Sequence, residues 1–315
     1  MKGLTDVPGL RVGHISDFDA ITGCTAILCE QGAVAGVDIR GSASGTQETP
    51  TLDPGHVTPR IHGILLAGGS AFGLEAASGV RRYLEHKGFG FDTGAAKVPI
   101  VPAAILYDLG IGKAGVRPNL AMGEAAAAAA TDDAVKEGCV GAGTGATVGK
   151  TLGMTCAMKS GIGSFTVNLP NGLMVSALVA VNAFGDVRDP STGKIVAGAR
   201  KNARSREFLD SQAHLKETAA AGWAGRNTTL GVVATNAVLT KVEATKLAQF
   251  ASLGMARTIY PVNTMFDGDT VFALSIGERH GDINSLGVAA SEALAEAILR
   301  AVKSAHTMGG IPGLA

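Results

Sequence analysis

Arg226-Asn227-Thr228-Thr229-Leu230 is a junction between a polar, glycine-bearing run and the apolar run Leu230-Gly231-Val232-Val233-Ala234. The abrupt change predicts a loop that opens directly into a buried strand. At such a boundary the hydroxyl of Thr228 can attack the carbonyl carbon of Asn227 and move the acyl group from nitrogen to oxygen. Hydrolysis of that ester would make Thr228 a new N-terminal residue, whose α-amine has an unperturbed pKa of roughly 7.7–8.0. An amine of that strength activates its neighbouring hydroxyl as a nucleophile near neutral pH.

Asn-Thr pairs are common, so a simple change from loop to strand is the ordinary explanation of this junction. The case for chemistry therefore depends on the rest of the chain.

The composition limits the class of protein. The chain has 315 residues, of which 46% are hydrophobic and only 4% aromatic, with 44 glycines. We expect a single domain whose core is built from Ala, Val, Leu and close backbone contacts. The 27 basic and 27 acidic residues cancel, so charge gives no reason to expect nucleic acid or an anionic membrane as a partner.

The N-terminal residues and the cysteines predict a cytoplasmic protein. Met1 to Pro8 lack the apolar stretch of a signal peptide, and no run reaches the ~18 apolar residues of a spanning helix. Cys24 and Cys29 lie five residues apart in a strand-like run, so their side chains point to opposite faces and cannot hold one metal ion. Buried free thiols in a reducing compartment are expected, and neither a metal nor a cofactor is predicted.

Hydrophobic patterns predict alternating strands and helices. Expected strands are 23–29, 34–39, 61–66, 155–158, 163–168, 173–181, 230–234 and 271–275, with a further apolar run at 98–106. Expected helices are 74–86, 120–136, 240–252 and 284–305, and residues 185–226 form a long polar connector. The helix over 120–136 contains Ala125 to Ala130, so it is expected to pack very close to a neighbouring element.

Three glycine-rich segments resemble known motifs but fail in detail. Gly68-Gly69-Ser70-Ala71-Phe72 lacks the last glycine of a nucleophile elbow. Gly110 to Gly115 has dinucleotide-binding spacing but is separated from the next helix by Val116 to Asn119. Gly141 to Thr151 resembles a phosphate loop, yet Thr144 occupies a required glycine position. A nucleotide-binding enzyme is therefore the weakest of the functions considered.

Three further features have ordinary explanations when each is taken alone. Lys150 is a single lysine in a glycine-rich turn, which predicts a solvated ammonium. Asn182 ends a strand, where asparagine usually forms a turn. Asp267-Gly268-Asp269 is an ordinary tight turn with two solvated carboxylates, and it has too few oxygen ligands for calcium.

Taken together, these features resemble the DmpA-type family of self-processing peptidases, which includes L-aminopeptidase/D-esterases, β-aminopeptidases and nylon-oligomer hydrolases. The similarity covers nearly the whole chain. It begins with Val7-Pro8-Gly9-Leu10-Arg11-Val12-Gly13-His14 and continues through Leu66 to Glu75, Ile105 to Asp108 and Gly141 to Gly143. Its most specific parts are Asn227 to Thr235 and Phe266 to Phe272.

The resemblance implies an α+β fold, namely an αββα sandwich of the DmpA/ornithine-acetyltransferase type. It also implies self-cleavage between Asn227 and Thr228, giving a large chain 1–227 and a small chain 228–315. The nucleophile would be Thr228, as in the nylon-hydrolase branch, whereas many members carry Ser. Homotetramers of such cleaved units are typical of the family.

The resemblance assigns roles to the remaining residues. Asn182 would donate to the oxyanion, and Lys150 would lie beside the nucleophile and lower the pKa of its amine through like charge. Asp267 and Asp269 would orient the freed amine or hydroxyl. β-Aminopeptidases have Ser and Glu at the matching pair, so specificity for β-peptides is not implied. Tyr107 matches a tyrosine implicated in maturation or substrate contact.

The expected activity is an N-terminal-threonine aminopeptidase, amidase or esterase that releases N-terminal amino acids from peptides, amides or esters. Hydrolysis of 6-aminohexanoate oligomers at the same site is an alternative. A third possibility, from another class, is an uncleaved ligand-binding or scaffold protein of the same fold.

Overall fold

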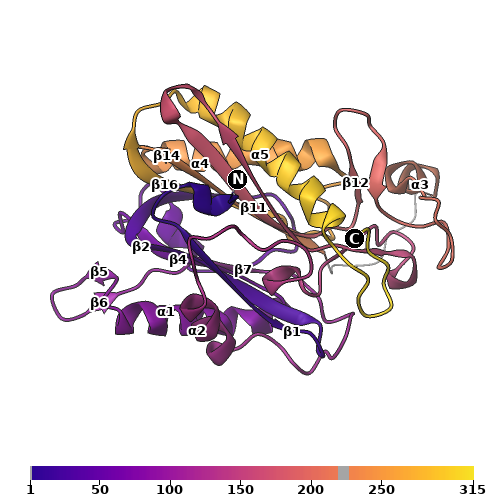
Figure 1. The fold of residues 1–315 in the computed structure, drawn as a ribbon, viewed down its shortest axis with the longest axis horizontal. Helices are drawn as coiled ribbons and strands as arrows, with labels where there is room; N and C mark the ends of the chain where they lie inside the picture. Colours follow the sequence, from indigo (N-terminus) through magenta and orange to yellow (C-terminus); the bar gives the residue numbers. More distant parts are fainter. Residues whose placement is uncertain (1, 219–226) are drawn as a thin grey trace.

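Four layers make up the molecule, in the order helices, sheet, sheet, helices (Figure 1). The computed structural model describes residues 2–218 and 227–315. The helices are α1 (Ala76–His86), α2 (Leu120–Ala128), α3 (Ser211–Thr218), α4 (Lys241–Thr258) and α5 (Ile283–Lys303). Helices α1 and α2 cover one sheet and α4 and α5 cover the other, so the αββα sandwich expected from the resemblance is confirmed.

A single long strand joins the two sheets. The strands of the main path are, in spatial order, β10 (Ile162–Asn168), β11 (Met174–Asn182), β14 (Thr228–Ala237), β16 (Thr270–Arg279), β2 (Thr22–Ile39), β4 (Ile61–Ala67), β7 (Ala103–Ile105) and β3 (Gly45–Gln47), with β1 (Arg11–Asp17) also paired to β2. The first part of β2 pairs with β1 and β4, and its last part, Val34 to Ile39, pairs with β16. The expected strands 23–29 and 34–39 are therefore one continuous strand.

Alternation along the strands divides the core into three layers. Leu230, Val232 and Ala234 of β14 face the space between the sheets, where they meet Ile27 and Ile64 of the other sheet. The intervening residues of the central strands face α4 and α5, and a third cluster lies between α1, α2 and the first sheet. Because side chains alternate with a period of two, each sheet is buried on both faces.

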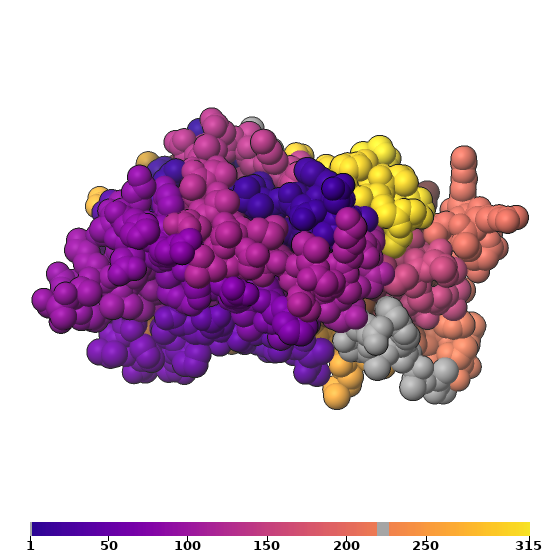
Figure 2. Space-filling view, turned by 90° about the horizontal axis from the view of Figure 1, so that it is seen from below, coloured from indigo at the N-terminus to yellow at the C-terminus, as the bar shows by residue number. Residues whose placement is uncertain are grey.

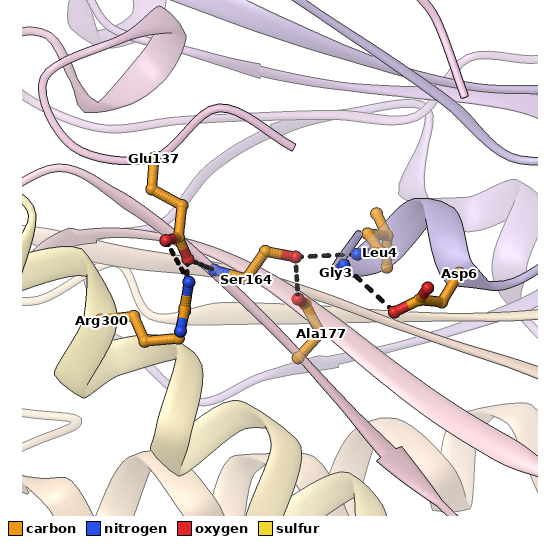
Figure 3. Close-up of polar contacts among 7 residues, drawn as sticks. All are labelled: Gly3, Leu4, Asp6, Glu137, Ser164, Ala177 and Arg300. Carbon is orange, nitrogen blue, oxygen red and sulfur yellow. Dashed lines mark hydrogen bonds and ion pairs between the residues drawn. The ribbon is translucent and has the colours of Figure 1, made fainter. Parts of the chain in front are cut away.

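The N-terminal segment contacts the side chains of β10 that point between the sheets, and Glu137 covers the outer edge of the same strand (Figure 3). The buried hydroxyl of Ser164 accepts the N–H of Leu4 at 2.8 Å and donates to the carbonyl of Ala177 at 2.6 Å. The Ser164 N–H donates to Glu137, which also pairs with Arg300 of α5. Covering an edge strand in this way removes unpaired backbone groups that would recruit another strand.

Small residues bring α2 very close to its neighbours, as the alanine run predicts. A Cβ added to Gly123 would lie 1.8 Å from the Ala76 carbonyl oxygen of α1, and one on Gly13 of β1 would lie 2.0 Å from that of Ala126. The predicted length of this helix was wrong, however. It ends at Ala128, because Thr131 leaves the helix to exchange two backbone hydrogen bonds with Val12.

Two other expectations are corrected. The expected strand 155–158 begins as a 3-10 turn at Met154–Cys156, followed by β9 (Met158–Lys159), which pairs with β8 (Thr147–Val148). The connector 185–226 contains β12 (Asp186–Arg188) and β13 (Ile195–Ala197), which join β15 (Ile259–Tyr260) in a small sheet, and then α3; residues 219–226 lie outside the described part. Buried Asp186 anchors this region by accepting the Ala199 and Ser211 N–H groups.

Figure 2 shows the α1 and α2 face, with the segment that contains β13 and α3 projecting at one end. The remaining short strands, β5 (Phe91–Asp92) and β6 (Lys97–Val98), form a separate hairpin. All four cysteines are buried and unpaired, and Cys24 and Cys29 lie in different core layers, which confirms that they point to opposite faces. In residues 2–218 and 227–315, no helix has both the length and the apolar character needed to cross a bilayer.

Candidate active site

Thr228 and Asn182 lie opposite each other at the end of the core between the two sheets. They are paired in the antiparallel register of β14 and β11. Thr228 is in phase with Leu230 and Val232, and Asn182 is in phase with Leu178 and Ala180, all of which face the other sheet. Residues directly opposite in such a pair share a face, so both polar side chains point toward the space between the sheets.

The carboxamide of Asn182 is held from three directions. Its Oδ1 accepts the Lys150 ammonium at 2.7 Å and the Thr147 N–H at 3.0 Å. Its Nδ2 donates to the Tyr107 carbonyl oxygen at 2.9 Å, which links β11 to the segment after β7 in the other sheet. Lys150 Nζ also donates to the main-chain oxygen of Asn182 at 2.9 Å. Asn182 is 0% exposed, so these contacts fix the amide in one orientation.

Asp267 and Asp269 flank the start of β14 from the turn that precedes β16. Asp269 accepts the Thr229 N–H at 2.7 Å and the Asn263 N–H at 3.0 Å. Asp267 accepts the Phe184 N–H at 3.1 Å, just after β11. Both carboxylates are almost fully buried, and they tie the ends of β11, β14 and β16 together.

The carbonyl oxygen of Asn227 has two donors. It accepts the Thr228 hydroxyl and, at 2.9 Å, the main-chain N–H of Gly268. A Cβ at Gly268 would lie 2.8 Å from Thr228 Oγ1 and 2.7 Å from the Ala43 oxygen. Only a residue without a side chain fits this position, so glycine brings the turn into contact with the threonine hydroxyl.

Burial shifts the pKa values of the ionisable groups at this site. Burial lowers the pKa of Lys150 to about 7, against the opposing effect of the carboxylates of Asp267 and Asp269. Burial, and then the neighbouring charge of Asp267, raises the pKa of Asp269 to about 7, while the N–H groups of Thr229 and Asn263 oppose the rise. Burial also raises the pKa of Asp267. Burial thus moves the pKa values of Lys150 and Asp269 toward the neutral range, where a general acid or base is most effective.

A small cavity adjoins the Asn182 network. Its lining includes Thr147, Lys150, Tyr107, Ile111 and Met154. Its volume is about 10 Å³, close to the smallest space that holds one water molecule.

Asp108 also borders this cavity, and sequence reasoning gave it no role. Its buried carboxylate accepts the Thr22 hydroxyl and the Gly69 N–H, each at 2.7 Å. A Cβ at Gly68 would lie 2.0 Å from Asp108 Oδ2. The absence of a side chain at Gly68 therefore lets the backbone of this turn approach the Asp108 carboxylate closely.

The site residues predicted from the sequence lie around the start of β14. The ordinary interpretations of Lys150 as a solvated ammonium and of Asp267 and Asp269 as solvated carboxylates are wrong, because all three are buried. Lys150 contacts Asn182, and among the described residues no hydrogen bond joins it to Thr228. Thr147 and Gly268 were missed, because each acts through a main-chain N–H that has no residue-type signature.

At the start of β14 the buried Thr228 hydroxyl donates to the carbonyl oxygen of the preceding residue, and the comparisons identify the class of protein as a peptide-bond hydrolase. The model of peptidase family S58 matches residues 2–315, and the chain belongs to that family of peptide-bond hydrolases. An uncharacterized aminopeptidase of Mycobacterium leprae is 38% identical, over 99% of this chain and 93% of the relative. A 6-aminohexanoate-oligomer endohydrolase of Kocuria sp. is 32% identical, over 95% of this chain and 85% of the relative.

Solved structures agree with this fold. The L-aminopeptidase D-Ala-esterase/amidase from Ochrobactrum anthropi, described as a variant of the Ntn-hydrolase fold, superimposes with a TM-score of 0.74 at 21% identity, covering 99% of this chain and 88% of that one. A β-aminopeptidase from Burkholderia sp. gives a TM-score of 0.70 at 23% identity, covering 100% and 91%.

Proposed function

We propose that the chain cleaves itself between Asn227 and Thr228 and then releases N-terminal amino acids from small peptides, amides or esters. The observation that supports this proposal is the hydrogen bond from the Thr228 hydroxyl to the carbonyl oxygen of Asn227. It lies at the start of the buried strand β14, opposite Asn182. Self-cleavage yields residues 1–227 and 228–315 in one folded domain. The new α-amine of Thr228 then acts as general base toward its own hydroxyl.

Each neighbouring residue has one role in the proposed mechanism. Thr228 Oγ1 attacks the substrate carbonyl, and an N–H of Asn182 donates to the oxyanion, a contact worth about 3 kcal/mol. Lys150 orients Asn182 through its hydrogen bonds, and its positive charge lowers the pKa of the α-amine at pH values where Lys150 is protonated. Asp267 and Asp269 hold the start of β14 and balance the positive charge that cleavage creates.

The cavity beside Tyr107 is assigned to the side chain of the substrate residue whose carbonyl is attacked. Its position next to Asn182 and its small volume both support an N-terminal residue with a small side chain, such as Gly or Ala. Hydrolysis of 6-aminohexanoate oligomers is a second candidate. It is favoured by the threonine nucleophile and by the 32% identity with the Kocuria enzyme.

Self-cleavage is tested by N-terminal sequencing and intact mass. We expect a second terminus that reads Thr-Thr-Leu-Gly and two fragments that meet at Asn227 and Thr228. The Thr228→Ala chain should remain whole and inactive. Cleavage of that variant at the same bond, or hydrolysis by wild-type protein with a single methionine terminus, would refute the nucleophile assignment. A folded wild-type chain that neither splits nor hydrolyses any substrate would favour a scaffold protein.

A substrate panel separates the two candidate activities. Processed enzyme is supplied with Gly and L-Ala anilides, dipeptides, amino-acid esters and 6-aminohexanoate oligomers. We further propose a cytoplasmic homotetramer of cleaved units, as the family resemblance and the buried free thiols suggest. Light scattering on processed protein tests the tetramer, because a mass equal to one cleaved unit would exclude it.

A further inference from the structure

The carbonyl that self-cleavage attacks and the amide that serves substrates lie in different hydrogen-bond networks. The Asn227 oxygen accepts the Gly268 N–H at 2.9 Å and the Thr228 hydroxyl. The described part of the chain contains no hydrogen bond between this oxygen and the side chain of Asn182. The donor nearest to the developing negative charge is therefore a main-chain group of the Asp267-Gly268-Asp269 turn.

The Gly268 N–H is fixed in place before any reaction. The Asp267 oxygen accepts the Ala43 N–H at 2.9 Å, and the Asp269 oxygen accepts the Gly41 N–H at 3.1 Å. These bonds join the turn to the segment that follows β2, so the turn is held by a second segment in addition to β14. A donor that is already oriented toward a developing charge requires no reorganisation during the reaction.

Asn182 cannot easily replace this donor. Its Oδ1 accepts both Lys150 Nζ and the Thr147 N–H, and one of its N–H groups donates to the Tyr107 oxygen. Turning the amide toward Asn227 would break this buried network. The second N–H of Nδ2 remains for an oxyanion, and its direction is fixed because the other bonds of the amide hold the side chain in place.

We propose that the main-chain N–H of Gly268 stabilises the oxyanion of self-cleavage, whereas Asn182 serves the carbonyl of an incoming substrate. The inference rests on the proposed function and adds that its two reactions use separate donors. In the first, Thr228 Oγ1 bonds to the Asn227 carbonyl carbon, and negative charge forms on the oxygen beside Gly268. The C–N bond then breaks, and the hydroxyl proton ends on the departing nitrogen. Water hydrolyses the ester to the Asn227 carboxylate and restores the Thr228 hydroxyl.

The two reactions can therefore be separated by mutation. Freshly translated full-length chains are followed by denaturing gel for the rate of self-cleavage, and the processed products are assayed with L-Ala anilide. Asn182→Ala should cleave itself at close to the wild-type rate, while its kcat falls by about 10²–10³-fold. Gly268→Ala should slow self-cleavage at least about tenfold, because its Cβ displaces the turn from Thr228. Gly115→Ala is the matched control, since a Cβ there meets nothing within 4 Å.

Each outcome decides the question. A folded Asn182→Ala chain that stays uncleaved, or a Gly268→Ala chain that cleaves as fast as the control, would overturn the proposal that the two reactions use separate oxyanion donors. If Asn182→Ala fails to fold by circular dichroism, Asn182→Asp decides instead, because it keeps an oxygen for Lys150 and removes the amide N–H groups. A wild-type chain that neither cleaves nor hydrolyses would refute the proposed function itself, which is a distinguishable result.

Discussion

Replacement of Lys150 by methionine tests whether this buried cation serves catalysis or the fold. The change removes two hydrogen bonds, from Nζ to Oδ1 of Asn182 at 2.7 Å and to its main-chain oxygen at 2.9 Å. Methionine has nearly the same length and fills the space without a charge. Assayed above pH 7, where the Lys150 charge is largely absent, a loss of activity will then come mainly from Asn182, whose amide loses the contact that orients it.

The expected magnitudes differ for activity and stability. Misalignment of an oxyanion donor costs about 2.7–4 kcal/mol, which corresponds to a fall in kcat of about 10²–10³-fold. For stability, two buried oxygens of Asn182 each lose a hydrogen-bond donor, and the loss of a donor to a buried oxygen costs about 1–3 kcal/mol. The variant also avoids the free-energy cost of burying an ammonium, and this offsets much of the stability lost with the hydrogen bonds. We therefore expect a large fall in kcat and a change in unfolding free energy below about 2 kcal/mol.

Lys159→Met is the matched control. Lys159 is equally buried, but its ammonium donates to the carbonyl oxygens of Gly143, Ala146 and Ser160 and, within the described part of the chain, makes no hydrogen bond to Asn182. Three buried carbonyls would lose a donor, so we expect Lys159→Met to cost about 3 kcal/mol or more in stability. Its kcat per folded molecule should change much less than that of Lys150→Met.

The assay measures kcat and KM of processed enzyme with L-Ala anilide, and stability by urea unfolding at the same pH. The reasoning is refuted if Lys150→Met keeps wild-type kcat while losing several kcal/mol of stability. It is refuted equally if Lys159→Met lowers kcat as much as Lys150→Met, because orientation of Asn182 would then not be the cause.

Three further outcomes follow from the structure. Burial lowers the pKa of Lys150 from 10.5 to about 7 on folding, so the unfolded chain binds more protons than the folded chain between these pH values. The wild type should therefore gain stability relative to Lys150→Met as pH rises from 7 toward 10, as measured by urea unfolding. A constant difference in unfolding free energy would contradict this. Met154→Ala should enlarge the cavity and so raise kcat/KM for L-Leu anilide relative to L-Ala anilide about tenfold. Met308→Ala should not, because Met308 packs in the same apolar cluster around Ile111 but does not line the cavity. Ser164→Ala should lower the unfolding free energy by about 1–3 kcal/mol, because the buried Leu4 N–H loses its acceptor, and unchanged urea unfolding would contradict that.

The sequence predicted the residues of the proposed site, which stay a prediction, but it did not predict that they are buried. Lys150, Asp267 and Asp269 lie in polar, glycine-rich stretches, where local pattern favours exposure. Their burial arises from pairing between distant segments, since the Lys150 ammonium contacts Asn182, 32 residues away, and Asp269 contacts Thr229, 40 residues away. Contacts over such separations leave no local periodicity in the chain, so pattern analysis cannot detect them.

Element boundaries show the same limit. The alanine run after Leu120 has high helix propensity, yet α2 ends at Ala128 because Thr131 pairs with Val12. The apolar centre of β14, residues 230–234, is predicted because burial on both faces produces a continuous apolar run, whereas the polar residues at both ends of the strand are not. Propensity therefore identified the elements, whereas tertiary hydrogen bonds determined where the helix stopped.

The location of the site explains why so rigid a part of the fold carries the chemistry. Thr228 begins a strand whose ten residues are all buried, and its neighbours on both sides, β11 and β16, supply Asn182 and the turn around Gly268. A strand held on both sides cannot shift its first residue without breaking two ladders. The proposed nucleophile Thr228, the Asn182 amide and the carboxylates are consequently positioned by the sheet itself, and glycine at position 268 lets the turn approach the hydroxyl closely. A loop of the same composition would have to order these groups during each reaction, at a cost in conformational entropy.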